Sequence, residues 1–165
     1  GSGSFNHLSA ELFNLMAGAR MVHIPYKSGA QTLTAVVSGE ADVLFQTIPP
    51  VQPYLVSGRR KALAVCTAAR HPLFPQLPTV SESGLPGFEV STWYGILAPA
   101  GTPGAVVASV NQALADVVKS PAVGKRLREL GVDPLTNTPD EFAALIHADT
   151  VKWAKVAKAA NIKVN

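Results

Sequence analysis

Two periodicities of apolar residues alternate along the first part of the chain, and this alternation restricts the fold more than any other feature. Apolar residues at helical spacing fill three stretches that each end on a glycine: residues 6–18, 29–39 and 49–58. Short apolar runs typical of buried strands lie between and after them: residues 20–26, 42–45 and 61–67. Strands that alternate with helices predict an α/β fold, in which helices pack on a mostly parallel sheet.

A proline-rich connector separates this alternating region from a mostly helical second half. The connector spans residues 70–87, and the apolar run at residues 89–98 predicts one more strand after it. Three helical stretches follow: residues 103–119, 121–130 and 138–156. Three amphipathic helices with few strands to cover indicate that part of the fold lies outside this sequence.

Capping residues predict where two of these helices begin. Thr102 is expected to cap the helix at residues 103–119, with Pro103 at the first helical position, where a missing N–H costs least. Thr138 and Glu141 have the spacing of a capping box, in which each residue satisfies the backbone N–H of the other. The last helix is therefore expected to begin immediately after Thr138.

Charge and cysteine usage narrow the functional classes. Lys and Arg number 14 against 11 Asp and Glu, and this net charge of +3 is spread along the chain. No nucleic-acid-binding arm is therefore predicted. The single cysteine, Cys66, excludes an intramolecular disulfide, and its apolar neighbours predict an inert buried thiol. No apolar run is long enough to span a bilayer.

Familiar enzyme motifs are missing from the sequence. It contains no G-x-S-x-G elbow, no P-loop and no H-E-x-x-H pair, and its four histidines lack metal-ligand spacing. We therefore expect no catalytic residue, no metal ion and no cofactor.

Three loops carry residues that suit a small anion. The first is rich in glycine and enters a helix, whose free N–H groups attract negative charge. The other two follow predicted strands, at the edge of the sheet where ligands gather in open α/β folds. Taken singly, the first loop could be only a capped helix start, and Lys27 in the second could be only a solvent-exposed charge. The prediction of an anion site therefore rests on the three loops together. The candidate ligand-binding residues are Gly1, Ser2, Gly3, Ser4, Phe5, His7, Tyr26, Lys27, Ser28, Gly29, Gln46 and Thr47.

Longer motifs surround these loops. Residues 1–13 fit G-x-G-[ST]-x-x-H-L-x-x-E-L-F, and residues 23–29 fit H-[IV]-P-Y-K-G with Ser28 before the glycine. Residues 77–88 fit L-P-x-V-x-E-x-G-[LF]-P-G-[FY], and residues 93–103 fit W-[FY]-G-[IL]-L-A-P-A-G-T-P. With these motifs, the chain resembles the Bug/TctC-type periplasmic proteins, which are the substrate-binding components of tripartite tricarboxylate transporters. One departure is Gln46, where such proteins often have Asp or Asn.

The resemblance implies a fold and a domain organisation. The fold is of periplasmic-binding-protein type II-like (Venus flytrap) form, a three-layer αβα architecture present here as an incomplete part of two domains. Residues 1–90 correspond to most of ligand-binding domain 2 without its first strand, and residues 91–165 to the C-terminal return segment and helices of domain 1. In such proteins a signal peptide and most of the first domain precede the loop at Gly1, which is the ligand-binding loop of the family.

The resemblance also implies a function. The chain is expected to capture a small carboxylate (an organic acid, a dicarboxylate or an amino acid) in an interdomain cleft in the periplasm. It is expected to deliver this ligand to the membrane permease subunits of the transporter, without catalysis and without nucleic acid. A serine-dependent α/β hydrolase and a non-binding interaction fragment of the same fold remain open as alternatives. Because part of the fold is missing, an oligomer or swapped assembly of the fragment is a further expectation.

Overall fold

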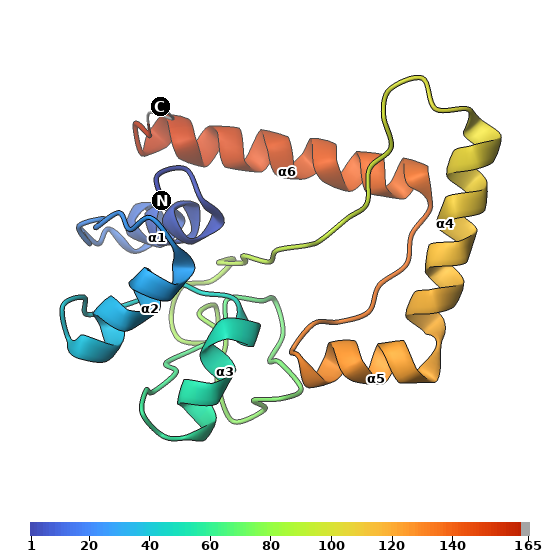
Figure 1. Ribbon diagram of the computed structural model, residues 1–165. Coiled ribbons are helices and arrows are strands. Elements are labelled where there is room, and N and C mark those ends of the chain that lie inside the picture. The colour runs from blue at the N-terminus through green and yellow to red at the C-terminus, as the bar shows by residue number, and fades with distance from the viewer. Residues whose placement is uncertain (163–165) are drawn as a thin grey trace. The chain divides into compact units, whose positions relative to one another are not determined.

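Six helices form within residues 1–162, the part of the chain that this computed structural model describes (Figure 1). They are α1 (Phe5–Ala17), α2 (Gly29–Ser38), α3 (Ile48–Val56), α4 (Gly104–Lys119), α5 (Pro121–Glu129) and α6 (Pro139–Ala159). The six helical stretches predicted in the sequence analysis are confirmed.

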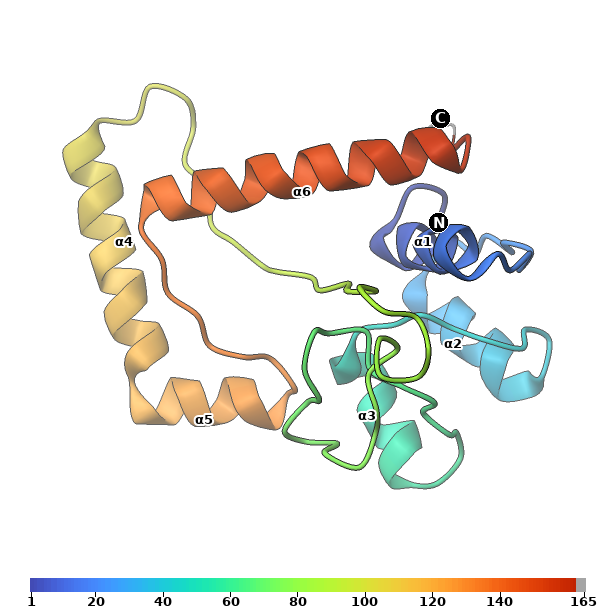
Figure 2. The same ribbon diagram turned by 180° about the vertical axis from the view of Figure 1, so that it is seen from behind.

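The chain divides into two compact units. Unit 1 consists of Gly1–Thr92 together with the residues from Trp153 onward, and unit 2 consists of Trp93–Lys152. Helices α1, α2 and α3 follow one another through unit 1 in both views (Figures 1 and 2). Helix α6 begins in unit 2 and ends in unit 1. The assignment of residues 1–90 and 91–165 to two domains of a binding protein stays a prediction.

Local hydrogen bonds explain where the first two helices begin and end. The Ser4 side chain accepts the His7 N–H at the start of α1, and the Ser28 side chain accepts the Gln31 N–H at the start of α2. Each helix ends on a glycine in the left-handed region, at a φ of 63° in α1 and 83° in α2. Because this region is open to glycine at little cost, glycine is the usual residue at such ends.

The two predicted caps of the second half have different outcomes. Thr138 and Glu141 form the capping box: the Thr138 N–H donates to Glu141 Oε2 at 2.8 Å, and the Glu141 N–H donates to Thr138 Oγ1 at 3.2 Å. The prediction that Thr102 caps α4, the helix that follows it, is wrong. Pro103 occupies the N-cap of α4, because the Thr102 hydroxyl donates to the Pro99 carbonyl at 2.8 Å and closes a turn instead.

The segments expected to be strands carry no ladder, and this part of the prediction needs correction. Within residues 1–162 the only β pairing is a single parallel bridge between Val65 and Thr79. Val65 donates its N–H to Pro78 and accepts the Val80 N–H, both at 2.9 Å. A strand is stabilised by hydrogen bonds from a neighbouring segment. Within residues 1–162, the apolar runs at residues 20–26 and 42–45 meet no such neighbour. The run at residues 89–98 meets one only through the Val90 N–H, which donates to the Cys66 carbonyl at 2.7 Å, so all three runs remain irregular.

The core of unit 1 forms around the end of the connector. Val80, Phe88 and Val90 are buried there. Side chains from α1, α6 and the irregular segments pack around them: Phe5, Leu12, Phe13, Phe45, Ala64, Cys66, Leu85 and Trp153. Cys66 is half-buried rather than buried as predicted, and this burial raises the pKa of its thiol to about 11, so the thiol is protonated at neutral pH.

Many large apolar side chains of both units are exposed. Unit 1 exposes Leu15, Met16, Val22, Ile24, Val43, Val56, Leu63 and Leu73. Unit 2 exposes Trp93, Tyr94, Ile96, Leu97, Val106, Val110, Val117, Leu130, Leu135, Leu145 and Val151. Exposed apolar surface that gathers into large patches favours association. None of the helices within residues 1–162 combines the length and apolar character needed to cross a membrane.

We expect the isolated 165-residue chain to self-associate. Val22 is 86% exposed and Leu63 is 69% exposed, so contact between chains removes apolar surface from water. Sedimentation velocity at roughly 10–100 µM, a range in which exposed apolar surface drives association, should show species larger than a monomer. A Val22→Thr/Leu63→Thr variant, altered only at exposed positions, should shift towards the monomer. A single monomeric species across the whole range would contradict the expectation.

Candidate functional site

The first candidate loop, residues 1–4, forms a turn that leads into α1. The Ser4 N–H donates to the Gly1 carbonyl at 3.2 Å, and the Ser4 hydroxyl caps the helix by accepting the His7 N–H at 3.4 Å. Gly3 has a φ of 73°, which lies in the left-handed region that favours glycine. The glycine-rich sequence is therefore used for a tight turn in front of a helix.

The turn occupies two of the backbone donors that the sequence suggests for an anion. Gly3 donates its N–H to His7 Nδ1 at 3.1 Å, and the Ser4 N–H is the donor to Gly1 described above. Within residues 1–162, the N–H groups of Phe5 and Asn6 donate no hydrogen bond, as is usual in the first turn of a helix. Asn6 is thus a candidate that sequence reasoning missed, although its position directly after the cap identifies it. Phe5 offers only its backbone, since its ring packs at 6.4 Å from Trp153.

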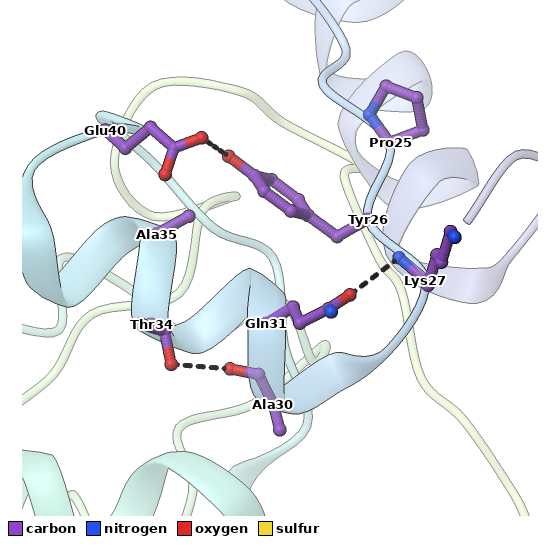
Figure 3. Close-up of a pocket in the computed structure, with 8 residues that line it drawn as sticks. All are labelled: Pro25, Tyr26, Lys27, Ala30, Gln31, Thr34, Ala35 and Glu40. Atoms are coloured by element: carbon purple, nitrogen blue, oxygen red, sulfur yellow. Dashed lines mark hydrogen bonds between the residues drawn. The ribbon is translucent and has the colours of Figure 1, made fainter.

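The second candidate loop, residues 26–29, borders an open hollow of about 560 Å³ beside α2 (Figure 3). The hollow is lined by Pro25, Tyr26, Lys27, Ala30, Gln31, Thr34, Ala35 and Glu40. The Gln31 side chain accepts the Lys27 N–H at 3.1 Å and holds the loop against the first turn of α2. Ser28 caps this helix, so its hydroxyl is also engaged.

Two charged residues of the hollow argue against a carboxylate inside it. The Tyr26 hydroxyl donates to Glu40 Oε1 at 2.9 Å, and the Lys27 side chain points away from this pair (Figure 3). Partial burial and the Glu40 carboxylate together raise the pKa of the Tyr26 hydroxyl. The Glu40 charge repels a second carboxylate, so Tyr26 offers its backbone rather than its side chain to an anion.

The third candidate loop, Gln46-Thr47, precedes α3. Gln46 Oε1 accepts the Thr47 N–H at 3.0 Å and lies 3.4 Å from the Thr47 hydroxyl. This assignment of the amide, made from its hydrogen bonds, leaves Gln46 Nε2 free to donate. Gln46 therefore presents a neutral donor at this position, whereas an Asp carboxylate in its place would repel an anionic ligand.

The structure brings the three loops next to one another within unit 1. A Cβ placed on Gly1 would lie 3.8 Å from the Tyr26 carbonyl oxygen, which joins the first loop to the second. A Cβ placed on Gly29 would lie 3.8 Å from Gln46 Nε2, which joins the second loop to the third. Each loop leads into a helix, α1, α2 or α3, and helix N-termini carry partial positive charge. The arrangement can hold a small anion through backbone and amide N–H groups.

Two stacked histidines, His7 and His23, lie beside the first loop, and His7 is hydrogen-bonded to it. The rings of His7 and His23 are stacked, with centroids 3.6 Å apart and an angle of 13° between their planes. His7 is 9% exposed, and its Nε2 lies 3.6 Å from Glu11 Oε1. No set of three His, Cys, Asp or Glu side chains in residues 1–162 is placed to hold a metal ion.

We expect the stability of the folded chain to fall below about pH 6.5. Burial and the neighbouring His7 and amino terminus lower the pKa of His23 from its ordinary value of 6.5, while Glu11 opposes the shift. The unfolded chain binds a proton near pH 6.5 that folded His23 resists, so the contribution of His23 is constant above that pH. It decreases as the pH falls towards the lower pKa of the folded state. Urea unfolding between pH 7.5 and 5 measures this slope, and His23→Gln should reduce it; an equal slope in both proteins would contradict the expectation.

A family model and curated relatives match almost the whole chain. The model described as "Tripartite tricarboxylate transporter family receptor" matches residues 1–162. The UPF0065 protein in the tcbD-tcbE intergenic region of Pseudomonas sp. (strain P51) is 33% identical over 157 residues, which are 94% of this chain and 47% of that protein. Protein BugT of Bordetella pertussis is 32% identical over 162 residues, which are 98% of this chain and 50% of that protein. The chain thus spans about half the length of these relatives.

Solved structures match the fold. Rpa4515 of R. palustris with adipate has a TM-score of 0.88 and 38% identity, over 97% of this chain and 54% of that one. Periplasmic binding protein BugD has a TM-score of 0.83 and 32% identity, over 96% and 54% of the two chains. MatC (Rpa3494) from Rhodopseudomonas palustris with malate has a TM-score of 0.78 and 32% identity, over 93% and 53%. The predicted fold class is confirmed: the chain is an incomplete part of a periplasmic-binding-protein fold.

Proposed function

Because this chain belongs to the tripartite tricarboxylate transporter receptor family, we propose that it is the part of a periplasmic solute-binding protein that holds a small carboxylate ligand. The ligand is a dicarboxylate or a related organic acid, and it passes from this protein to the permease subunits of a transporter. The protein binds the ligand without converting it, a role supported by its similarity to BugD, which is described as a periplasmic binding protein.

One observation carries the proposal: three loops that each start a helix adjoin one another in unit 1. Backbone N–H groups at a helix start and a neutral amide donor are the groups that bind carboxylates without a charged partner. The unengaged N–H groups of Phe5 and Asn6 and the Nε2 of Gln46 supply such donors. Rpa4515 and MatC, which share this fold, were solved with adipate and malate, both dicarboxylates.

The candidate residues take different parts in this proposal. Gly1 and Gly3 shape the first loop, Ser2 lies exposed beside them, and Ser4 and His7 fix the helix start. The backbone of Tyr26, Lys27 and Gly29, capped by Ser28, forms the second wall, and Gln46 with Thr47 forms the third. Phe5 and Asn6 contact the carboxylate through their N–H groups.

Calorimetry on a chimera tests the function. In the chimera, this chain replaces the matching 54% of Rpa4515, so that the remainder of that protein can complete the cleft. We expect adipate or malate to bind with a dissociation constant of roughly 1–100 µM, about −8 to −5 kcal/mol. The isolated 165-residue chain, titrated in parallel, should bind much more weakly because it lacks the other wall.

The control separates folding from binding. Circular dichroism and a cooperative thermal transition establish that the chimera is folded before it is titrated. A folded chimera that binds neither adipate, malate nor another small carboxylate would refute the proposed function. Hydrolysis of a fluorogenic ester by the same preparation would favour a hydrolase instead.

A further inference from the structure

His7 is tied to three neighbours at once, and these ties suggest a role other than contact with a ligand. It lies in the first turn of α1 and is 9% exposed. Its ring stacks on His23 at 3.6 Å, and its Nε2 faces Glu11 at 3.6 Å. Its other ring nitrogen, Nδ1, accepts the Gly3 N–H at 3.1 Å.

The hydrogen bond from the Gly3 N–H determines the tautomer of the neutral His7 ring. A nitrogen that accepts a hydrogen bond carries no proton, so the bonding pattern assigns the ring proton of neutral His7 to Nε2, facing Glu11. Both nitrogens of His7 are then engaged within the protein. A ligand that bound to His7 directly would have to break one of these contacts.

We propose that His7 is a positioning residue, which holds Gly3 in its left-handed turn so that the Phe5 and Asn6 N–H groups stay open towards one carboxylate. This inference rests on the proposed function and specifies how its first loop works. The stacked His23 ring keeps the His7 ring plane in line with the Gly3 N–H. Gly3, at a φ of 73°, would otherwise sample many conformations, because glycine loses the most freedom on folding.

Two substitutions of His7 separate its acceptor from its ring. His7→Phe keeps a flat ring that can stack on His23 but has no acceptor for the Gly3 N–H. His7→Asn loses the ring but places an amide oxygen near the position of Nδ1. A structural role of the ring predicts that Asn is the more damaging change, whereas the proposed role of the acceptor predicts that Phe is.

The first readout needs no ligand. Nuclear magnetic resonance of the folded, ligand-free chimera, labelled with ¹⁵N, should show a coupling across the hydrogen bond between the Gly3 nitrogen and His7 Nδ1. This coupling should vanish in His7→Phe, and exchange of the Gly3 amide proton should become roughly five- to tenfold faster, as the loss of one hydrogen bond predicts. A Gly3 amide equally protected in wild type and His7→Phe would overturn the inference.

The second readout is the affinity of the chimera for adipate. His7→Phe should weaken binding roughly three- to tenfold, and His7→Asn should recover part of this loss. Equal affinities for wild type and His7→Phe, or a larger loss in His7→Asn, would overturn the role of the acceptor. Failure of the unaltered chimera to bind any carboxylate would refute the proposed function instead, and the Gly3 measurement on the folded, ligand-free chimera would still decide what His7 holds.

Discussion

Replacing Gly3 with valine should lower the adipate affinity of the chimera at least roughly tenfold, which corresponds to about 1.4 kcal/mol. Gly3 has a φ of 73°, a conformation that a β-branched residue adopts only under strain of about 1–3 kcal/mol. The turn would open to relieve this strain, and the Gly3 N–H would leave His7 Nδ1. The N–H groups of Phe5 and Asn6 would then lose their common direction.

Gly3→Asn is the matched control for this prediction. Asparagine also adds a side chain but is several-fold enriched in the left-handed region, so the turn can persist. We expect Gly3→Asn to retain more affinity than Gly3→Val, with both variants assayed by calorimetry after their folding is checked. If valine and asparagine have the same small effect, the first loop takes no part in ligand binding.

Replacing Gly95 with valine should destabilise unit 2 by about 1–3 kcal/mol, as overpacking does in a close contact. A Cβ on Gly95 would lie 2.7 Å from Phe142 Cε1, and the Cζ of the same ring would be nearer still. The ring cannot move aside freely, because it packs edge-on against Trp93 with centroids 5.0 Å apart. Trp93 is held in turn by the hydrogen bond from its Nε1 to Asp149 Oδ2, at 2.7 Å.

Urea unfolding followed by Trp93 fluorescence measures this effect, in a Trp153→Phe background that leaves one tryptophan. Gly104→Ala is a matched control, since a Cβ there has nothing within 4 Å and alanine suits the start of α4. Adding Phe142→Ala to Gly95→Val should recover part of the lost stability if the two residues clash. Purely additive losses in the double variant would show that the ring is not the obstacle.

The helices were largely predictable because their signals lie within a few residues of the chain. Ser28 and Gly39 bracket α2, and Thr138 with Glu141 begin α6, through bonds between residues three or four positions apart. The strands were not predictable in the same way. The apolar run at residues 61–67 forms one β bridge, at Val65, and accepts one further backbone bond, from the Val90 N–H to the Cys66 carbonyl. A full ladder needs a partner segment that local sequence does not supply.

The three loops of the candidate site were predictable from the sequence. The N–H groups that stay free to bind an anion were predictable only in part. The motifs around Gly3, Lys27 and Gln46 identified three loops, and the structure places these loops side by side. Sequence reasoning assigned the anion donors to the N–H groups of Gly3, Ser4 and Phe5. Those of Gly3 and Ser4 are engaged by His7 and Gly1, and only that of Phe5 stays open. Whether the candidate residues bind a ligand stays a prediction.

The sequence by itself determined the family, through motifs that run in order along the chain, and the helix ends, through caps that act locally. Only the tertiary structure decided which polar groups stay free to bind a ligand and which are hydrogen-bonded within the protein. Three contacts join residues on different segments: the stack of His7 on His23, the hydrogen bond from Tyr26 to Glu40, and the approach of Gly29 to Gln46. The physical reason is that both partners of a local hydrogen bond lie within a few residues of each other in the sequence. A contact between segments depends instead on where the whole fold places them.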